Sequence, residues 1–91
     1  MSVVEFCGHI NGHVVTQAVE QLEVELAAQP ASFLVIDGTA IEGYSPDVRA
    51  PGVALLKVAK RYGVLSGVCV APSAAVRMMG AAVAFVSSLP F

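Results

Sequence analysis

Charged residues are scarce in this 91-residue chain: they make up 13% of it, where a typical soluble domain has about 25%. Five of them are basic and the net charge is −2, so the sequence offers no cationic surface for nucleic acid or phosphate groups. Hydrophobic residues instead make up 56% of the chain. Low charge with high hydrophobicity excludes intrinsic disorder, which has the opposite composition.

Long uninterrupted apolar runs are also missing. A membrane-spanning helix needs about 20 mostly apolar residues. The best candidate, residues 73–89, contains Arg77 and Gly80 and lies between Pro72 and Pro90. We therefore expect an amphipathic or buried helix there, and no transmembrane segment. The N-terminus has no basic residues ahead of a long apolar stretch, so no signal peptide is expected.

Cysteine occurs twice, as Cys7 and Cys69, each inside an apolar, β-like run. Buried reduced thiols are the preferred interpretation, ahead of a disulfide or a catalytic thiol. A chain with reduced thiols is typical of the cytoplasm, which is the expected location.

The charges are segregated along the chain, because every acidic residue precedes every basic one. The simpler interpretation is two solvated helix faces of opposite sign. The alternative is a dipolar surface that steers self-association or a partner.

The first part of the chain predicts a strand over residues 3–10, which are β-prone. Asn11-Gly12 permits a hairpin, but the residues that follow have helical periodicity, so we interpret this turn as a link to a helix over 13–28. The apolar stripe of that helix comprises Val15, Ala18, Val19, Leu22 and Leu26.

Two further strand–helix units follow. The apolar run within 32–37 is typical of a strand buried on both faces, and 39–47 predicts a loop. A helix is expected from about Ala50-Pro51 to Gly63, then a strand over 64–71. Ser73 is a candidate N-cap for a last helix. This β-α-β-α-β-α order predicts one α/β domain over residues 1–91, with a small, mostly parallel sheet.

The last helix carries two apolar stripes, although a helix that covers one sheet face needs only one. The surplus predicts a homo-oligomer, most simply a dimer. The expected contact residues are Met78, Ala82, Phe85, Leu89 and Phe91.

Known catalytic and metal-binding patterns are absent. His9 and His13 are four residues apart, but Asn11-Gly12 separates them and nothing completes a zinc site, so no metal is expected. There is no nucleophile elbow and no glycine-rich phosphate loop. We therefore expect neither a cofactor nor enzymatic activity.

Three acids, Asp37, Glu42 and Asp47, follow the second predicted strand. Such carboxylates bind cations or act as acid and base in some proteins, but capping and solvation of the loop is preferred. The least favoured alternative is an enzyme that uses Asp37 and Glu42 with His9 or His13.

Two segments carry a resemblance to a known family. Phe33-Leu34-Val35-Ile36 leads into the run Asp37-Gly38-Thr39-Ala40-Ile41-Glu42-Gly43-Tyr44-Ser45-Pro46, which is similar to a D-x-x-x-(I/V)-x-G-(Y/F)-x-P pattern. Val68-Cys69-Val70-Ala71 then precedes a helix that contains Val76-Arg77-Met78. Over about two-thirds of its length, the chain resembles the STAS domains of bacterial anti-sigma-factor antagonists, and within them the SpoIIAA-like or STAS/SEC14-type branch.

The resemblance implies an α/β fold, a cytoplasmic location and regulation by protein–protein contact without catalysis. It implies a contact surface beyond the second strand, made of Asp37, Glu42, Tyr44, Ser45, Asp47 and Arg49. Ser45 lies closest to the serine that is phosphorylated in the antagonists, although Pro46 departs from their pattern. Relative to the family, the chain looks shortened at both ends. The SEC14-type likeness favours an alternative, a carrier of a small apolar ligand or lipid bound by Met78, Met79 and Phe85.

Overall fold

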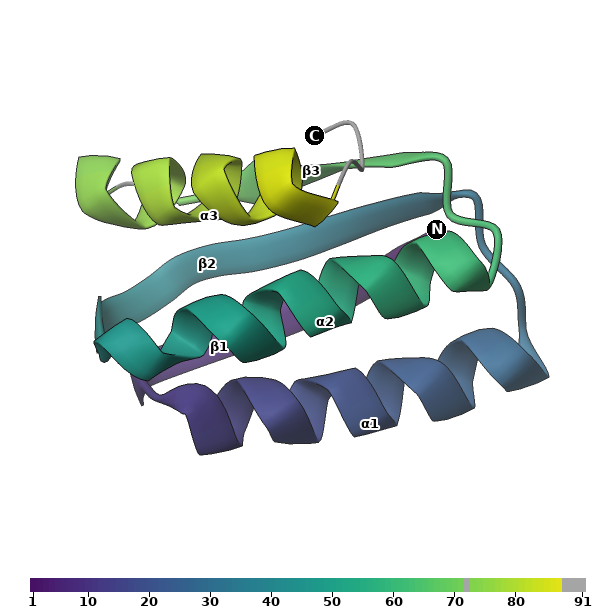
Figure 1. The fold of residues 1–91 in the computed structure, drawn as a ribbon, viewed down its shortest axis with the longest axis horizontal. Helices are drawn as coiled ribbons and strands as arrows, with labels where there is room; N and C mark the ends of the chain where they lie inside the picture. The colour runs from purple at the N-terminus through teal and green to yellow at the C-terminus, as the bar shows by residue number, and fades with distance from the viewer. Residues whose placement is uncertain (72, 88–91) are drawn as a thin grey trace.

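The structure is a computed structural model that describes residues 1–71 and 73–87, with 82–87 described by their backbone alone. The elements in chain order are β1 (Ser2–Ile10), α1 (Gly12–Ala28), β2 (Phe33–Tyr44), the 3-10 turn η1 (Pro46–Val48), α2 (Arg49–Arg61), β3 (Ser66–Val70) and α3 (Ala74–Ser87). The strands form a parallel sheet in the order β1-β2-β3. The three helices lie side by side over one face of this sheet (Figure 1). The predicted α/β fold and its order of elements are confirmed.

Helix α1 forms where its periodicity predicts it. The Asn11 side chain accepts a hydrogen bond of 3.0 Å from the backbone N–H of Val14, which caps the first turn. The buried residues Val15, Leu22 and Leu26 fall on one side of the helix, as a 3.6-residue period requires.

Strand β2 is longer than the sequence predicts, and the predicted loop over 39–47 is wrong for its first part. Residues 39–44 continue the strand, and Ala40, Ile41, Gly43 and Tyr44 pair with β1. Two irregularities in the register of β1 accompany this pairing, one between Glu5 and Cys7 and one between Gly8 and His9. Bulges of this kind let a glycine-rich segment stay in a sheet although its pattern is typical of a loop.

The core lies between the sheet and the helices. Leu34 from the middle strand and Leu55, Leu56 and Ala59 from α2 are almost fully buried. These three α2 residues lie on one side of the helix. The helix begins at Arg49, just before the expected start, and Gly63 follows it with φ +95°, a conformation in which glycine is favoured.

The outer face of the sheet is uncovered by any element that the structure describes. Val3, Val68 and Val70 are 49%, 41% and 44% exposed. The expectation of a strand buried on both faces is therefore wrong, because the two crossover helices, α1 and α2, and the final helix α3 all lie on the same side of the sheet. Cys7 is exposed for the same reason, which corrects its prediction as a buried thiol; Cys69 points to the helices and is half-buried. Both thiols are free.

Helix α3 contains three of the residues predicted to form an oligomer face, Met78, Ala82 and Phe85. Met78 is 73% exposed. The side chains of Ala82 and Phe85, together with Leu89 and Phe91, lie outside the described residues. Across the ranges that the structure describes, none of the helices has the length and apolarity needed to cross a lipid bilayer.

Candidate functional site

The carboxyl ends of the strands and the amino ends of the helices meet at one end of the molecule, on the left in Figure 1. This is the edge at which parallel α/β sheets bind ligands and partners. Ile10 and Tyr44 end adjacent strands and pair with each other. The backbone N–H of Ser45 donates a 2.9 Å hydrogen bond to the Ile10 carbonyl, so the segment that leads into α2 is tied to β1.

Ser45 and His9 form a side-chain pair at this edge. The Ser45 Oγ lies 3.0 Å from the His9 Nε2, within hydrogen-bond distance. Ser45 is half-buried and His9 is exposed. The family resemblance selects Ser45, but nothing in the sequence links Ser45 with His9. Ser45 falls in the predicted loop over 39–47, and only the extension of β2 to Tyr44 brings it beside the end of β1.

Tyr44 connects the middle strand with the third helix. Its hydroxyl group donates a hydrogen bond of 3.5 Å to the carbonyl of Ala75, in the first turn of α3. This contact joins the two segments that carry the STAS resemblance. Tyr44 is half-buried, so it has both a structural role and a surface that a partner can reach.

Asp47 lies against the start of α1. A Cβ atom added to Gly12 would be 2.9 Å from both the backbone carbonyl oxygen and the carboxylate Oδ2 of Asp47, closer than real atoms allow. A glycine is therefore needed at position 12 so that η1 can approach the helix. Asp47 is itself exposed, as are Glu42 and Arg49, so this end of the molecule presents charges of both signs.

Asp37 is separated from this group, although the sequence places it with the others. It lies in the first half of β2, in register with Glu5 and Val70. Its Oδ1 accepts hydrogen bonds from the backbone N–H of Thr39 at 3.0 Å and from the Thr39 hydroxyl at 2.7 Å. These bonds, the one from the hydroxyl above all, lower the pKa of Asp37.

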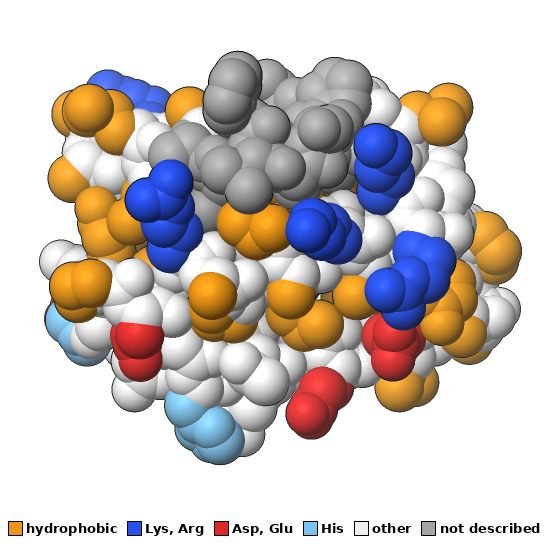
Figure 2. All heavy atoms as spheres, viewed as in Figure 1, with side chains coloured by type: hydrophobic (Ala, Val, Ile, Leu, Met, Phe, Trp, Pro, Cys, Tyr) orange, Lys and Arg blue, Asp and Glu red, His pale blue; other side chains and the backbone are white. Residues whose placement is uncertain are grey.

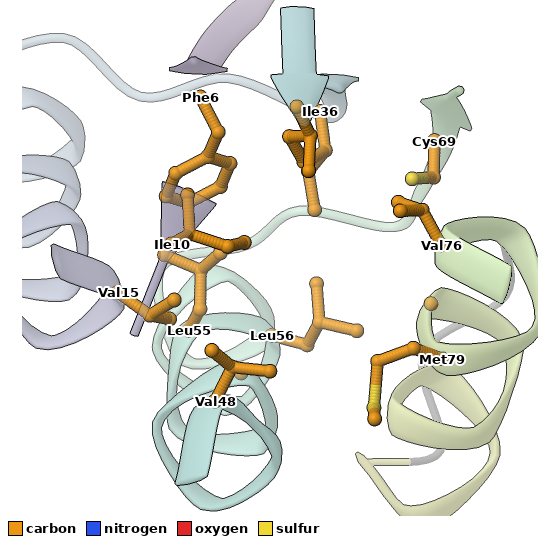
Figure 3. Close-up of a pocket in the computed structure, with 13 residues that line it drawn as sticks. Phe6, Ile10, Val15, Ile36, Val48, Leu55, Leu56, Cys69, Val76 and Met79 are labelled. Carbon is orange, nitrogen blue, oxygen red and sulfur yellow. The ribbon is translucent and has the colours of Figure 1, made fainter. Parts of the chain in front are cut away.

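The helix-covered side of the sheet contains an apolar pocket of about 90 Å³ between α2, α3 and the strands. Figure 3 shows Leu56 of α2 facing Val76 and Met79 of α3 across it, with Ile36 and Cys69 of the sheet at the top of the view. The described residues that line this pocket are apolar. Met79 lines it as the carrier alternative expects, whereas Met78 does not; the Phe85 side chain lies outside the described residues.

The segregation of charge along the sequence persists in space. On the helix face, cationic side chains gather over α2 and toward α3, and acidic ones over α1 (Figure 2). One contact joins the two regions: Arg61 Nη1 lies 3.8 Å from Glu23 Oε2, with both side chains largely in solvent. A pair this exposed adds little stability, so most of these charges are available to attract other molecules.

Within residues 1–71 and 73–87, no three His, Cys, Asp or Glu side chains are grouped so that they could hold a metal ion. The enzymatic alternative needs Asp37 and Glu42 beside His9 or His13. The hydrogen bonds instead join Asp37 to Thr39 and His9 to Ser45.

Comparison with known proteins adds no assignment. No protein-family model matches the chain, and no curated protein matches it.

Proposed function

We propose that the protein is a non-enzymatic regulatory module that binds a protein partner, as the STAS domains that it resembles do. Its contact surface is the carboxyl edge of the sheet, with Glu42, Tyr44, Ser45, Asp47 and Arg49. The observation that supports this most is the position of the Ser45 hydroxyl, just ahead of α2. Its Oγ lies 3.0 Å from the Nε2 of His9. A pre-positioned hydroxyl among exposed charges, at the edge where such sheets bind ligands, suits recognition of a protein.

Ser45 is also the candidate phosphorylation site of this module. A phosphate there adds about two negative charges next to Asp47. Such a change in charge would alter any contact made through this edge. Mass spectrometry of the chain isolated from its host should detect phosphoserine at position 45. Phosphate on other serines but never on Ser45 contradicts this role.

Capture from the host extract tests the contact surface. Arg49→Glu and Lys57→Glu make the same charge change in the same helix, and both residues are exposed. Arg49 lies at the proposed edge, whereas Lys57 lies in the middle of α2. We expect at least one protein to bind the original chain and the Lys57→Glu variant but not Arg49→Glu or Ser45→Glu.

The variants must keep their fold, which circular dichroism and thermal unfolding establish. Equal capture by Arg49→Glu and Lys57→Glu would show that the edge is not the contact surface. If the original chain captured no protein from the host extract, that result would also count against the proposal.

The apolar pocket supports a second candidate, a carrier of a small apolar molecule or of the end of a lipid chain. Its lining residues in the described part of the chain are apolar and include no polar side chain that could hold a headgroup, so these residues would select a ligand by shape. Native mass spectrometry of the purified chain tests this. Val76→Phe, which fills the pocket, should abolish a co-purified ligand, and the exposed Met78→Phe should retain it. An original chain that carries no ligand and takes up none from added fatty acid contradicts this candidate.

A further inference from the structure

The strand register identifies which side chains lie on the uncovered face of the sheet. Val3, Val35 and Val68 are partners across the three strands, and Glu5, Asp37 and Val70 form the next row. Phe33 precedes Val35 on the same face and is 36% exposed. We call this set of outward residues the open face: Val3, Glu5, Phe33, Val35, Asp37, Val68 and Val70.

An open face of this kind is unusual in a parallel sheet. Purely parallel sheets occur almost only with both faces covered, because their strands are apolar on both sides. The three helices cover the inner face alone. An exposed and contiguous apolar surface marks a site of interaction, so another element is expected to cover the open face.

The size of the open face fits one helix better than a second copy of the chain. Strands lie about 4.8 Å apart and rise about 3.3 Å per residue, and β3 has 5 residues. The shared part of the sheet is thus roughly 16 Å long and 10–15 Å wide, close to three turns of a helix about 10 Å across. A stable dimer buries about 800 Å² on each partner, which is well beyond this area.

The charge of the open face indicates the chemistry of that helix. Glu5 and Asp37 are register partners, and the hydrogen bonds from Thr39 keep Asp37 ionised. The sequences of β1, β2 and β3 contain neither Lys nor Arg. A second copy would bring the same two carboxylates to the contact, whereas a basic side chain would neutralise them.

We propose that the open face binds an amphipathic helix of a partner protein, whose apolar stripe packs on Val35 and Val68 and whose Lys or Arg side chains lie beside Glu5 and Asp37. In this mode a partner helix packs its apolar stripe on an apolar surface, and the charges beside the stripe set its orientation. It uses a different surface from the carboxyl edge, and each of the two proposals can fail without the other.

Three synthetic helical peptides of about 14 residues test the proposal with the full chain. They share one stripe of Leu and Ala and carry Lys, Gln or Glu beside it. Fluorescence anisotropy gives the affinity of each peptide. The rate of Cys7 alkylation shows whether a bound peptide shields the outer side of the sheet, since Cys7 is exposed on the same side of β1 as Val3 and Glu5. We expect the Lys peptide to bind about tenfold more tightly than the Glu peptide, to lose affinity with added salt, and to slow the alkylation of Cys7.

Matched variants locate the contact. Val68→Asp places a charge in the open face and should weaken binding of the Lys peptide by about tenfold. Val24→Asp makes the same change on α1, where Val24 is 71% exposed, and should have no effect. Glu5→Gln should reduce the preference for the Lys peptide over the Gln peptide.

Several results would overturn the proposal. The first is equal affinity of the chain for the Lys and Glu peptides. The second is an equal loss of affinity for the Lys peptide in the Val24→Asp and Val68→Asp variants. The third is that no peptide binds at millimolar concentration. Finally, sedimentation that shows a dimer in the original chain and a monomer in Val68→Asp assigns the open face to a second copy.

Discussion

Asp37 illustrates how two local hydrogen bonds favour the ionised form of a half-buried carboxyl group. Its carboxylate accepts two hydrogen bonds from Thr39, and these lower the pKa of Asp37 below its ordinary value. A carboxyl group whose pKa is lower in the folded state stabilises that state when it is ionised. This contribution is present above the unfolded pKa, about 4, and is lost as the pH falls through the folded pKa.

Replacement of Thr39 by valine tests this cause directly. Thr39→Val keeps the backbone N–H and the shape of the side chain but removes the hydroxyl, which is the largest contributor to the lower pKa. The pKa of Asp37 should rise toward its ordinary value in a carboxyl titration followed by NMR. The stability of the variant should also depend less on pH in the acidic range.

Thr16→Val is the matched control. The Thr16 hydroxyl donates to the Gly12 carbonyl, 2.8 Å away, and to no carboxylate. It should leave the titration of Asp37 unchanged. An unchanged pKa of Asp37 in Thr39→Val would contradict the assigned cause.

The pair formed by His9 and Ser45 shows why residue-scale sites are hard to predict from sequence. The two residues are 36 positions apart, and the run that carries the family resemblance contains Ser45 but not His9. Their contact depends on the end-to-end register of β1 and β2, which includes two irregularities. Hydrophobic periodicity carries no information on such irregularities, so the sequence selected Ser45 alone.

At the scale of elements, there is a physical reason why the sequence predicts the full length of α1 but only the first part of β2. A helix of 17 residues repeats its apolar pattern over several turns, so the period is evident from sequence alone. Strand β2 has 12 residues, and Gly38 and Gly43 interrupt the second half of its pattern. The pairing partner, not the local propensity, keeps these residues in the sheet.

Gly38 is needed for close packing of β2 and not for a turn. A Cβ atom at this position would lie 3.0 Å from Ile41 Cδ1 and 3.2 Å from the backbone carbonyl oxygen of Val70. The side chain of Ile41 can move, but the backbone of β3 is fixed by the sheet. Gly38→Ala should therefore destabilise the fold by about 1–3 kcal/mol, measured by urea denaturation.

Gly80 offers the matched comparison in α3. A Cβ atom there would lie 3.4 Å from Cys69 Sγ, an ordinary contact. Alanine favours a helix interior over glycine by about 1 kcal/mol, so Gly80→Ala should stabilise the fold. A Gly38→Ala variant as stable as the original chain would show that β2 and β3 can separate without cost.

At the scale of the whole molecule, the distribution of apolar residues follows from the order of the strands. Because β1, β2 and β3 are neighbours in sequence order, each right-handed crossover returns on the same side. The sheet therefore has one face packed with helices and one open face. Composition alone indicates a surplus of apolar residues, which the sequence predicts to lie on the last helix. In the described part of the chain, the open face of the sheet also exposes apolar side chains, among them Val3, Val68 and Val70.

The two cysteines test this asymmetry without any partner, because one lies on each side of the sheet. Cys7 is exposed, while Cys69 is half-buried among pocket residues and burial raises the pKa of its thiol. Since the thiolate is the reactive form, an aromatic disulfide reagent at neutral pH should modify one thiol quickly and the other slowly. Cys7→Ser should remove the fast phase and Cys69→Ser the slow one. Equal rates for both thiols in the folded chain would mean that the outer side of the sheet is covered as fully as the inner side.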